Sequence, residues 1–188
     1  MQARLIYVMG ASGSGKDSLL GYARRRLADR SDLAFAHRYI TRPADAGGEN
    51  HVALTASEFA ARQQAGLFAL AWESHGLSYG IGIEIHQWLA QGAAVVVNGS
   101  RAYLPEARHR FPALQPVWIE VCASVLRQRL LSRGRESTEA IEHRLRRHAA
   151  MLQSPQRDAV VTNNGPLAEG GEALVELIRA GLAQALCA

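Results

Sequence analysis

The sequence has almost no lysine. Its 188 residues include 21 basic side chains, of which only Lys16 is a lysine and the other twenty are arginines. A lysine kept in a chain that otherwise uses arginine indicates a position where a flat, forked guanidinium would be too bulky. We therefore expect Lys16 to have a specific chemical role.

Cysteine and long apolar runs are also scarce. The two cysteines, Cys122 and Cys187, form no metal-ligand pair and no disulfide framework, so two free thiols are predicted. The longest apolar runs, 5–9, 93–97 and 117–121, are far shorter than the roughly 20 residues that cross a bilayer. The N-terminus lacks the layout of a secretory signal. These absences exclude a disulfide-stapled miniprotein and a membrane span, and they favour a cytoplasmic protein.

The remaining composition is that of one ordinary globular domain. Charged residues make up 20% and hydrophobic residues 48% of the chain, and the net charge is only +4. The densest basic groups, 24–26 and 144–147, lie in stretches with helical periodicity and have no aromatic residues between them. We expect the first group to be a solvated helix face, and neither a nucleic acid nor a membrane is predicted as a partner. A homodimer is compatible with the sequence.

Short apolar runs rich in valine and isoleucine alternate with longer stretches of helical periodicity. This alternation predicts an α/β fold with a parallel sheet flanked by helices. The predicted strands are 4–9, 93–98, 117–121 and 159–162, and the predicted helices are 16–27, 103–111, 123–133 and 172–186.

Two regions depart from the alternation. Residues 37–91 contain short extended pieces at 38–41 and 68–72, a helix at 57–65 and a glycine-bearing loop at 78–82, which predicts an inserted subdomain. Residues 129–151 are strongly charged and are predicted to form a lid. The core of the domain would then consist of residues 1–36, 92–128 and 152–188.

A phosphate-binding loop is the strongest motif. The first predicted strand runs directly into a glycine-rich loop, and a helix follows, which is the context that the G-x-x-x-x-G-K motif requires. Its glycines let backbone N–H groups turn inward around a phosphate chain, and Lys16 adds a positive charge. The predicted nucleotide-binding residues are Gly10, Ala11, Ser12, Gly13, Ser14, Gly15, Lys16, Asp17 and Ser18.

The residue after the lysine departs from this motif. It is normally a serine or threonine whose hydroxyl binds Mg²⁺, but here it is Asp17, followed by Ser18. A carboxylate is also a good Mg²⁺ ligand, so Asp17 or Ser18 is expected to hold the metal. The alternative for Asp17 is a favourable charge in the first turn of a helix.

With this motif in place, the whole chain resembles the guanylate kinase family of P-loop NTPase kinases. The resemblance implies that ATP donates a phosphoryl group, that Arg38, Arg42 and Tyr79 bind the acceptor, and that Asn163 lies near the adenine. It also implies that Arg133, Arg135 and Arg144 close over ATP as part of the lid. The segments that carry it are 38–43, Gly48-Glu49, Ser57-Glu58-Phe59, Tyr79-Gly80, 129–147 and 158–163.

Several departures separate the chain from guanylate kinases themselves. By ungapped count, Leu70 occupies the position of the glutamate that reads guanine, and a leucine cannot accept those hydrogen bonds. An acceptor-phosphate tyrosine is missing after Glu49, and Asn98 stands where the family has an aspartate. Together the departures resemble the ribose 1,5-bisphosphate phosphokinases of phosphonate degradation, which implies ribose 1,5-bisphosphate as acceptor and 5-phospho-α-D-ribosyl 1-diphosphate (PRPP) as product. Arg101 would then add a contact to the acceptor.

Other functions remain open at this point. Leu70 argues against a guanylate kinase that phosphorylates GMP, and the intact loop with Lys16 argues against a non-catalytic guanylate-kinase-like interaction module. A solvated surface position is the alternative for Arg101. His51 and His75 lie in the predicted acceptor region. Each is interpreted either as a contact to sugar or phosphate or as a plain surface residue.

Overall fold

Two β-sheets form the framework of the protein. The computed structural model describes residues 4–133, 139, 141–143, 145–146 and 159–186. Within them, a parallel sheet of five strands has the order β2-β7-β1-β8-β9, and a mixed sheet of four strands has the order β4-β3-β6-β5. The predicted α/β fold with a helix-flanked parallel sheet is confirmed.

The large sheet is covered on both faces. One core layer joins it to α1 and α7, and another joins it to α3 and α4. The elements of this part are β1 (Leu5–Gly10), α1 (Lys16–Arg26), β2 (Leu33–Phe35), α3 (Glu84–Ala90), β7 (Ala94–Asn98), α4 (Leu104–Arg110), β8 (Gln115–Glu120), α5 (Ala123–Arg133), β9 (Val160–Thr162) and α7 (Leu167–Leu186). Because β1 is buried on both faces, its sequence is a continuous apolar run rather than an alternating one.

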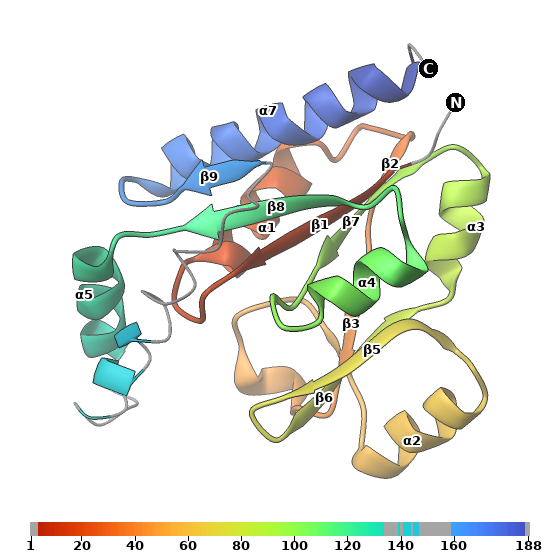
Figure 1. The fold of residues 1–188 in the computed structure, drawn as a ribbon, viewed down its shortest axis with the longest axis horizontal. Helices are drawn as coiled ribbons and strands as arrows, with labels where there is room; N and C mark the ends of the chain where they lie inside the picture. The colour runs from red at the N-terminus through yellow and green to blue at the C-terminus, as the bar shows by residue number, and fades with distance from the viewer. Residues whose placement is uncertain (1–3, 134–138, 140, 144, 147–158, 187–188) are drawn as a thin grey trace.

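The small sheet lies at the other end of the molecule from α7 (Figure 1). All of its strands come from the predicted insertion, and Leu70 and Ile81 from this sheet share a core with the large sheet. The elements are β3 (Arg38–Ile40), a 3-10 turn (Ala44–Ala46), β4 (Val52–Ala53), α2 (Ala56–Gln64), β5 (Phe68–Ser74) and β6 (Leu77–Gly82). Thr55 and Glu58 start α2 with reciprocal bonds between side chain and backbone, a capping box.

The predicted loop at 78–82 is wrong, because these residues belong to strand β6. The two glycines suggested a turn, but Gly80 is needed for close packing: a Cβ atom there would lie 2.6 Å from the ring of Phe68 on the neighbouring strand. The short elements β2, β4 and α3 had no clear signal in the sequence. Tertiary packing, rather than local sequence preference, forms them.

The last helix also begins earlier than predicted, at Leu167 rather than residue 172. Gly170 and Gly171 in its first turns are poor helix formers, which misplaced the boundary. A Cβ atom on Gly171 would lie 2.5 Å from the ring of Tyr22, so this glycine lets α1 and α7 approach closely.

Two sequence predictions concern the surface of the protein. Cys122 is an exposed free thiol, as predicted, whereas Cys187 lies outside the described residues. Within the described part of the chain, every helix is too short or too polar to cross a membrane.

Candidate active site

The phosphate loop (residues 10–18) joins the end of β1 to the start of α1. Gly13 and Gly15 have φ angles of 92° and 82°, in the left-handed region that glycine adopts without strain. The loop also lies tightly against α5, since a Cβ atom on Gly13 would be 2.8 Å from the Leu126 side chain. Both glycines are therefore required by backbone geometry as well as by the motif.

Two side chains from distant elements hold the loop at Ser14. The Asn163 amide donates to the Ser14 carbonyl at 2.7 Å, and an Arg129 guanidinium nitrogen donates to the same oxygen at 3.3 Å. Asn163 is only 4% exposed, so its described contact positions the loop backbone, and contact with adenine stays a prediction. Arg129 was not singled out as a site residue from the sequence, because its proximity to the loop depends on how α5 packs.

Lys16 reaches across to the neighbouring strand of the large sheet. Its side chain is 12% exposed, and its ammonium donates to the Asn98 amide oxygen and, at 3.1 Å, to the Asp17 carboxylate. Asn98 ends β7, which pairs with β1 in parallel, so the two residues meet at the carboxyl edge of the sheet. Burial lowers the pKa of the Lys16 ammonium, although the neighbouring Asp17 carboxylate acts in the opposite direction.

Asn98 is fixed by the turn that follows it. The buried Tyr7 hydroxyl donates to the Ser100 carbonyl and accepts from the Ser100 N–H, both at 2.9 Å. Gly99 packs directly on the Tyr7 ring, where any Cβ atom would overlap the ring carbons. Burial raises the pKa of the Tyr7 hydroxyl, so it stays protonated and able to donate. Sequence reasoning noted Asn98 only as a departure from the guanylate kinases and missed its central place.

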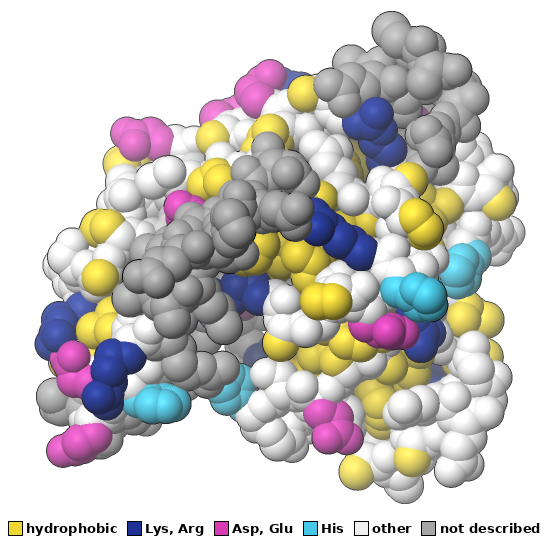
Figure 2. Space-filling view, viewed as in Figure 1, with side chains coloured by type: hydrophobic (Ala, Val, Ile, Leu, Met, Phe, Trp, Pro, Cys, Tyr) yellow, Lys and Arg dark blue, Asp and Glu magenta, His cyan; other side chains and the backbone are white. Residues whose placement is uncertain are grey.

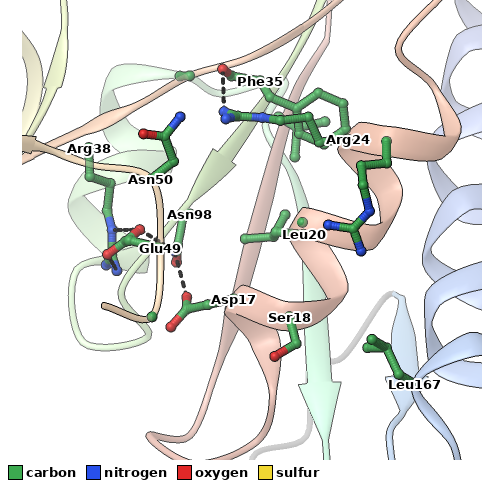
Figure 3. Close-up of a pocket in the computed structure, with 15 residues that line it drawn as sticks. Asp17, Ser18, Leu20, Arg24, Phe35, Arg38, Glu49, Asn50, Asn98 and Leu167 are labelled. Atoms are coloured by element: carbon green, nitrogen blue, oxygen red, sulfur yellow. Dashed lines mark hydrogen bonds and ion pairs between the residues drawn. The ribbon is translucent and has the colours of Figure 1, made fainter. Parts of the chain in front are cut away.

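Asp17 faces the same cluster, while Ser18 does not. The Asn98 amide nitrogen donates to the Asp17 carboxylate at 2.9 Å, and Figure 3 shows the Ser18 side chain pointing away from Asn98. Burial alone would raise the pKa of the Asp17 carboxyl. The positive charges of Lys16 and Arg38 outweigh that effect and hold the pKa below its usual value.

The insertion contributes Arg38 and Glu49 to this cluster. The Arg38 guanidinium forms a two-pronged ion pair with the Glu49 carboxylate, one bond being 2.9 Å long, and both side chains are about one-tenth exposed. The Asn98 amide nitrogen also donates to Glu49 at 2.9 Å (Figure 3). Asn98 therefore connects the phosphate loop to the insertion, and Arg38 has an acidic partner that a phosphate would have to replace.

Arg42 has one buried hydrogen-bond donor that is not used among the described residues. One of its terminal nitrogens donates to the Gly47 carbonyl at 3.2 Å, but its Nε atom is buried and has no hydrogen-bond partner among the described residues. A buried unsatisfied donor is unfavourable unless a ligand supplies the acceptor. His51 lies against Arg42, with its Nδ1 atom 3.2 Å from the Arg42 guanidinium. His51 therefore contacts a residue that is predicted to bind the acceptor, and its own contact with sugar or phosphate stays a prediction.

Of the other two residues predicted to bind the acceptor, Tyr79 lies in the cluster and Arg101 does not line the cavity. Tyr79 lies beneath Arg38, whose guanidinium carbon is 5.0 Å from the centre of the ring, so these two predicted residues are brought together. Arg101 follows Asn98 in the turn after β7 but does not line the cavity described below. Leu70 is fully buried in the core and offers no polar group to an acceptor.

A cavity of about 380 Å³ opens beside this cluster (Figure 3). It is bounded by the exposed face of α1 from Asp17 to Arg25, by residues 48–50 of the insertion and by Leu167 at the start of α7. Its volume falls in the range of small-molecule sites. One end of the cavity holds Asp17, Glu49 and Arg38, and the other end holds Arg24 and Arg25.

The predicted lid residues are described only in part. Arg133 is the last residue of α5, and Arg135 and Arg144 lie outside the described residues. Of the same region, Ile141 and Leu145 are buried in a cluster with residues of α5. The lid therefore stays a prediction.

Basic side chains do not gather into one patch on the face shown in Figure 2. They appear there as separate groups, with hydrophobic and uncharged polar atoms between them. A nucleic-acid surface would instead present a continuous positive stripe. Three arginines, Arg24, Arg25 and Arg38, line the cavity instead.

The residues of the cluster fit a bound Mg²⁺ ion. Mg²⁺ is usually held by one or two carboxylates together with substrate phosphates and water, and the Asp17 carboxylate is ionised, partly exposed and beside the phosphate loop. Among the described residues, no three acidic, histidine or cysteine side chains form a complete cage. A metal at this place would therefore need the phosphates of the substrate.

Comparison with known proteins gives close relatives. The chain is 56% identical over 177 residues to "Ribose 1,5-bisphosphate phosphokinase PhnN" of Chromobacterium violaceum, covering 94% of both chains. The protein of the same name from Psychromonas ingrahamii is 53% identical over 180 residues, covering 95% of this chain and 91% of the relative. No protein-family model matches the chain.

Solved structures support the fold. A guanylate kinase from Anaplasma phagocytophilum superposes with a TM-score of 0.69 at 15% identity, covering 97% of this chain and 88% of the other. A gluconokinase from Sinorhizobium meliloti gives a TM-score of 0.51 at 23% identity, covering 97% of this chain and 93% of the other. The predicted P-loop kinase fold is confirmed, and, because of the sequence identity to its close relatives, the chain belongs to the ribose 1,5-bisphosphate phosphokinase family.

Proposed function

We propose that this protein transfers the γ-phosphoryl group of ATP to the 1-phosphate of ribose 1,5-bisphosphate, forming PRPP during phosphonate catabolism. The names of the close relatives support this acceptor. The observation that carries the proposal is the network through Asn98, whose amide group bonds both to Lys16 of the phosphate loop and to Glu49 of the insertion. Donor and acceptor phosphates bound on its two sides would meet at this point.

The reaction needs alignment more than it needs a base. An oxygen of the 1-phosphate attacks the γ-phosphorus, and the bond from that phosphorus to the bridging oxygen of ATP breaks, so ADP leaves with the bridging oxygen and its electron pair. The attacking phosphate is already ionised near neutral pH. Catalysis therefore depends on positioning and on stabilising the negative charge that spreads over the transferred group.

The residues of the site divide this work. Lys16 supplies positive charge to the transferring phosphoryl group, and the loop N–H groups hold the remaining phosphates. Arg42 and Arg38 bind the acceptor phosphate, the first through its unpartnered Nε atom and the second after release from Glu49. Bound Mg²⁺, held by Asp17 and the phosphates, would neutralise charge on ATP.

An acceptor comparison tests the proposed function. With ATP, we expect ribose 1,5-bisphosphate to support ADP formation at least about 100-fold faster than GMP does, because Leu70 and its buried neighbours offer no partner for a base edge. Chromatography should identify PRPP as the product. Fast turnover with GMP and none with ribose 1,5-bisphosphate would instead make the protein a guanylate kinase.

The role of Asp17 has its own test. Replacing Asp17 by asparagine keeps its shape but removes a charged metal ligand, so the Mg²⁺ concentration for half-maximal rate should rise about tenfold. Asp29→Asn, in the exposed turn after α1, is the control and should leave the Mg²⁺ titration unchanged. If Asp17→Asn also leaves it unchanged, Asp17 only supplies charge to the helix start.

A further inference from the structure

The end of the cavity farthest from the phosphate loop contains positive charge that the proposed mechanism does not use. Asp17 and Arg24 lie on one face of α1, seven residues apart, which corresponds to about 10 Å along the helix. The mechanism places the transferring phosphate at the Asp17 end. The Arg24 end, which also includes Arg25, Phe35 and Asn50, has no role in that step.

Among the described residues, only uncharged groups hold Arg24 in place. Its guanidinium donates to the Phe35 carbonyl at 3.1 Å, lies 3.4 Å from the His37 Nε2 atom, and stacks over the Phe35 ring at 5.7 Å (Figure 3). No carboxylate of the described residues is within ion-pair distance of it. A partly buried cation without a counter-ion is unfavourable unless an anion binds there.

The groups around Arg24 are arranged to donate hydrogen bonds. The Asn50 amide nitrogen lies 3.1 Å from the same His37 Nε2 atom, so two donors share this one nitrogen and it must be the acceptor. Burial and the Arg24 charge both lower the pKa of the His37 imidazole, which agrees with a neutral ring. Arg25, at the exposed rim, adds a second guanidinium that has no partner among the described residues.

Gly21 keeps the path between the two ends open. It lies inside α1, where glycine is unfavourable, and it lines the cavity. A Cβ atom there would have only one neighbour within 4 Å, the Arg25 guanidinium at 3.7 Å, which is an ordinary contact. Core packing therefore does not require a glycine at this position, and a large side chain there would extend into the cavity.

We propose that the Arg24 end of the cavity binds a second phosphate of the acceptor, its 5-phosphate, while the 1-phosphate lies at the Asp17 end. This inference rests on the proposed function and explains how a bisphosphate would be preferred over a sugar with one phosphate. The ribose ring would lie over Gly21. Arginine suits this role because its fork can bind two phosphate oxygens at once.

Two substitutions test the second phosphate site. For Arg24→Gln, we expect the KM for ribose 1,5-bisphosphate to rise about 10-fold to 100-fold, as for loss of a charge-assisted hydrogen bond, while the KM for ATP stays unchanged. We expect ribose 1-phosphate, which has no 5-phosphate, to react more slowly than ribose 1,5-bisphosphate, and Arg24→Gln should leave that slower reaction unchanged. Gly21→Met should obstruct the ribose position and raise the same KM without removing any hydrogen bond. Arg26→Gln, on the same helix but paired with Glu172, should change none of these values.

The outcomes separate this inference from the proposed function. If the unaltered protein turns over ribose 1,5-bisphosphate but Arg24→Gln slows both acceptors equally, or raises the KM for ATP, Arg24 is structural or nucleotide-binding and the second site is wrong. If the unaltered protein shows no turnover with this acceptor, the proposed function fails. Calorimetric binding of ribose 1,5-bisphosphate without ATP then decides the second site by itself: tight binding that Arg24→Gln abolishes supports it, and absent binding overturns it.

Discussion

Replacing Lys16 by arginine should lower kcat about 1,000-fold or more while leaving the protein folded. The charge is kept, but the guanidinium is wider than an ammonium, and the Lys16 side chain is only 12% exposed between Asn98 and Asp17. A displaced charge no longer stabilises the transferring phosphoryl group. Removing one preorganised donor of this kind typically costs a factor of about 100 to 1,000, and distortion of the neighbouring loop should add to the loss.

The measurement is steady-state ADP release, with circular dichroism and thermal unfolding to check the fold. Arg179→Lys exchanges the same two residue types on an exposed part of α7 and should leave kcat unchanged. If Lys16→Arg retained near-normal turnover, Lys16 would have no part in phosphoryl transfer. The chain offers no other lysine that could substitute for it.

Replacing Gly15 by alanine should have the second-largest effect. Gly15 has a φ angle of 82°, which costs other residues about 1 to 2 kcal/mol. In addition, its new Cβ atom would overlap the amide group of Asn163, which holds the Ser14 carbonyl. The loop would have to move away from Asn163, so we expect kcat/KM for ATP to fall about 100-fold. We also expect a free energy of unfolding lower by about 2 kcal/mol or more.

Gly92→Ala is the matched control for this substitution. Gly92 also has a positive φ angle, 86°, but nothing lies within 4 Å of its Cβ position, so only the backbone strain is shared. Its stability should fall by about 1 to 2 kcal/mol with unchanged kinetics for ATP. Equal stability losses in the two variants, with normal ATP kinetics in Gly15→Ala, would show that contact with Asn163 is unimportant for the loop.

Much of the fold could be predicted because its signals are local. The continuous apolar run before the phosphate loop predicted a strand at 4–9, and β1 occupies Leu5–Gly10. The loop itself could be assigned residue by residue, since glycine spacing and one lysine define its backbone geometry. Elements that depend on partners were missed. The glycines of β6 suggested a loop, because the sequence does not show that Gly80 packs against the ring of Phe68, twelve residues earlier in the chain.

The site itself could be predicted only in part. Lys16, Asp17, Arg38, Arg42 and Tyr79 were named from motif and resemblance, and the structure places all of them in or beside one cluster. Asn98, Glu49 and Arg129 were not named as site residues. Asn98 reaches the loop because two parallel strands end together, Glu49 because the insertion folds back on the loop, and Arg129 because α5 packs against it. The spacing of residues in the sequence does not show such contacts.

The sequence by itself determined the donor half of this protein, because a phosphate loop is built from consecutive residues and its function follows from their backbone conformation. Tertiary structure decided the acceptor half. Only folding brings Asn98, eighty-two residues from Lys16, into contact with its ammonium and pairs Arg38 with Glu49. It also places Arg24 at the far end of the cavity, without a counter-ion among the residues that the structure describes. The physical reason is that charges and donors act through distances in space, and the acceptor side of the cavity is assembled from segments that are far apart in the chain.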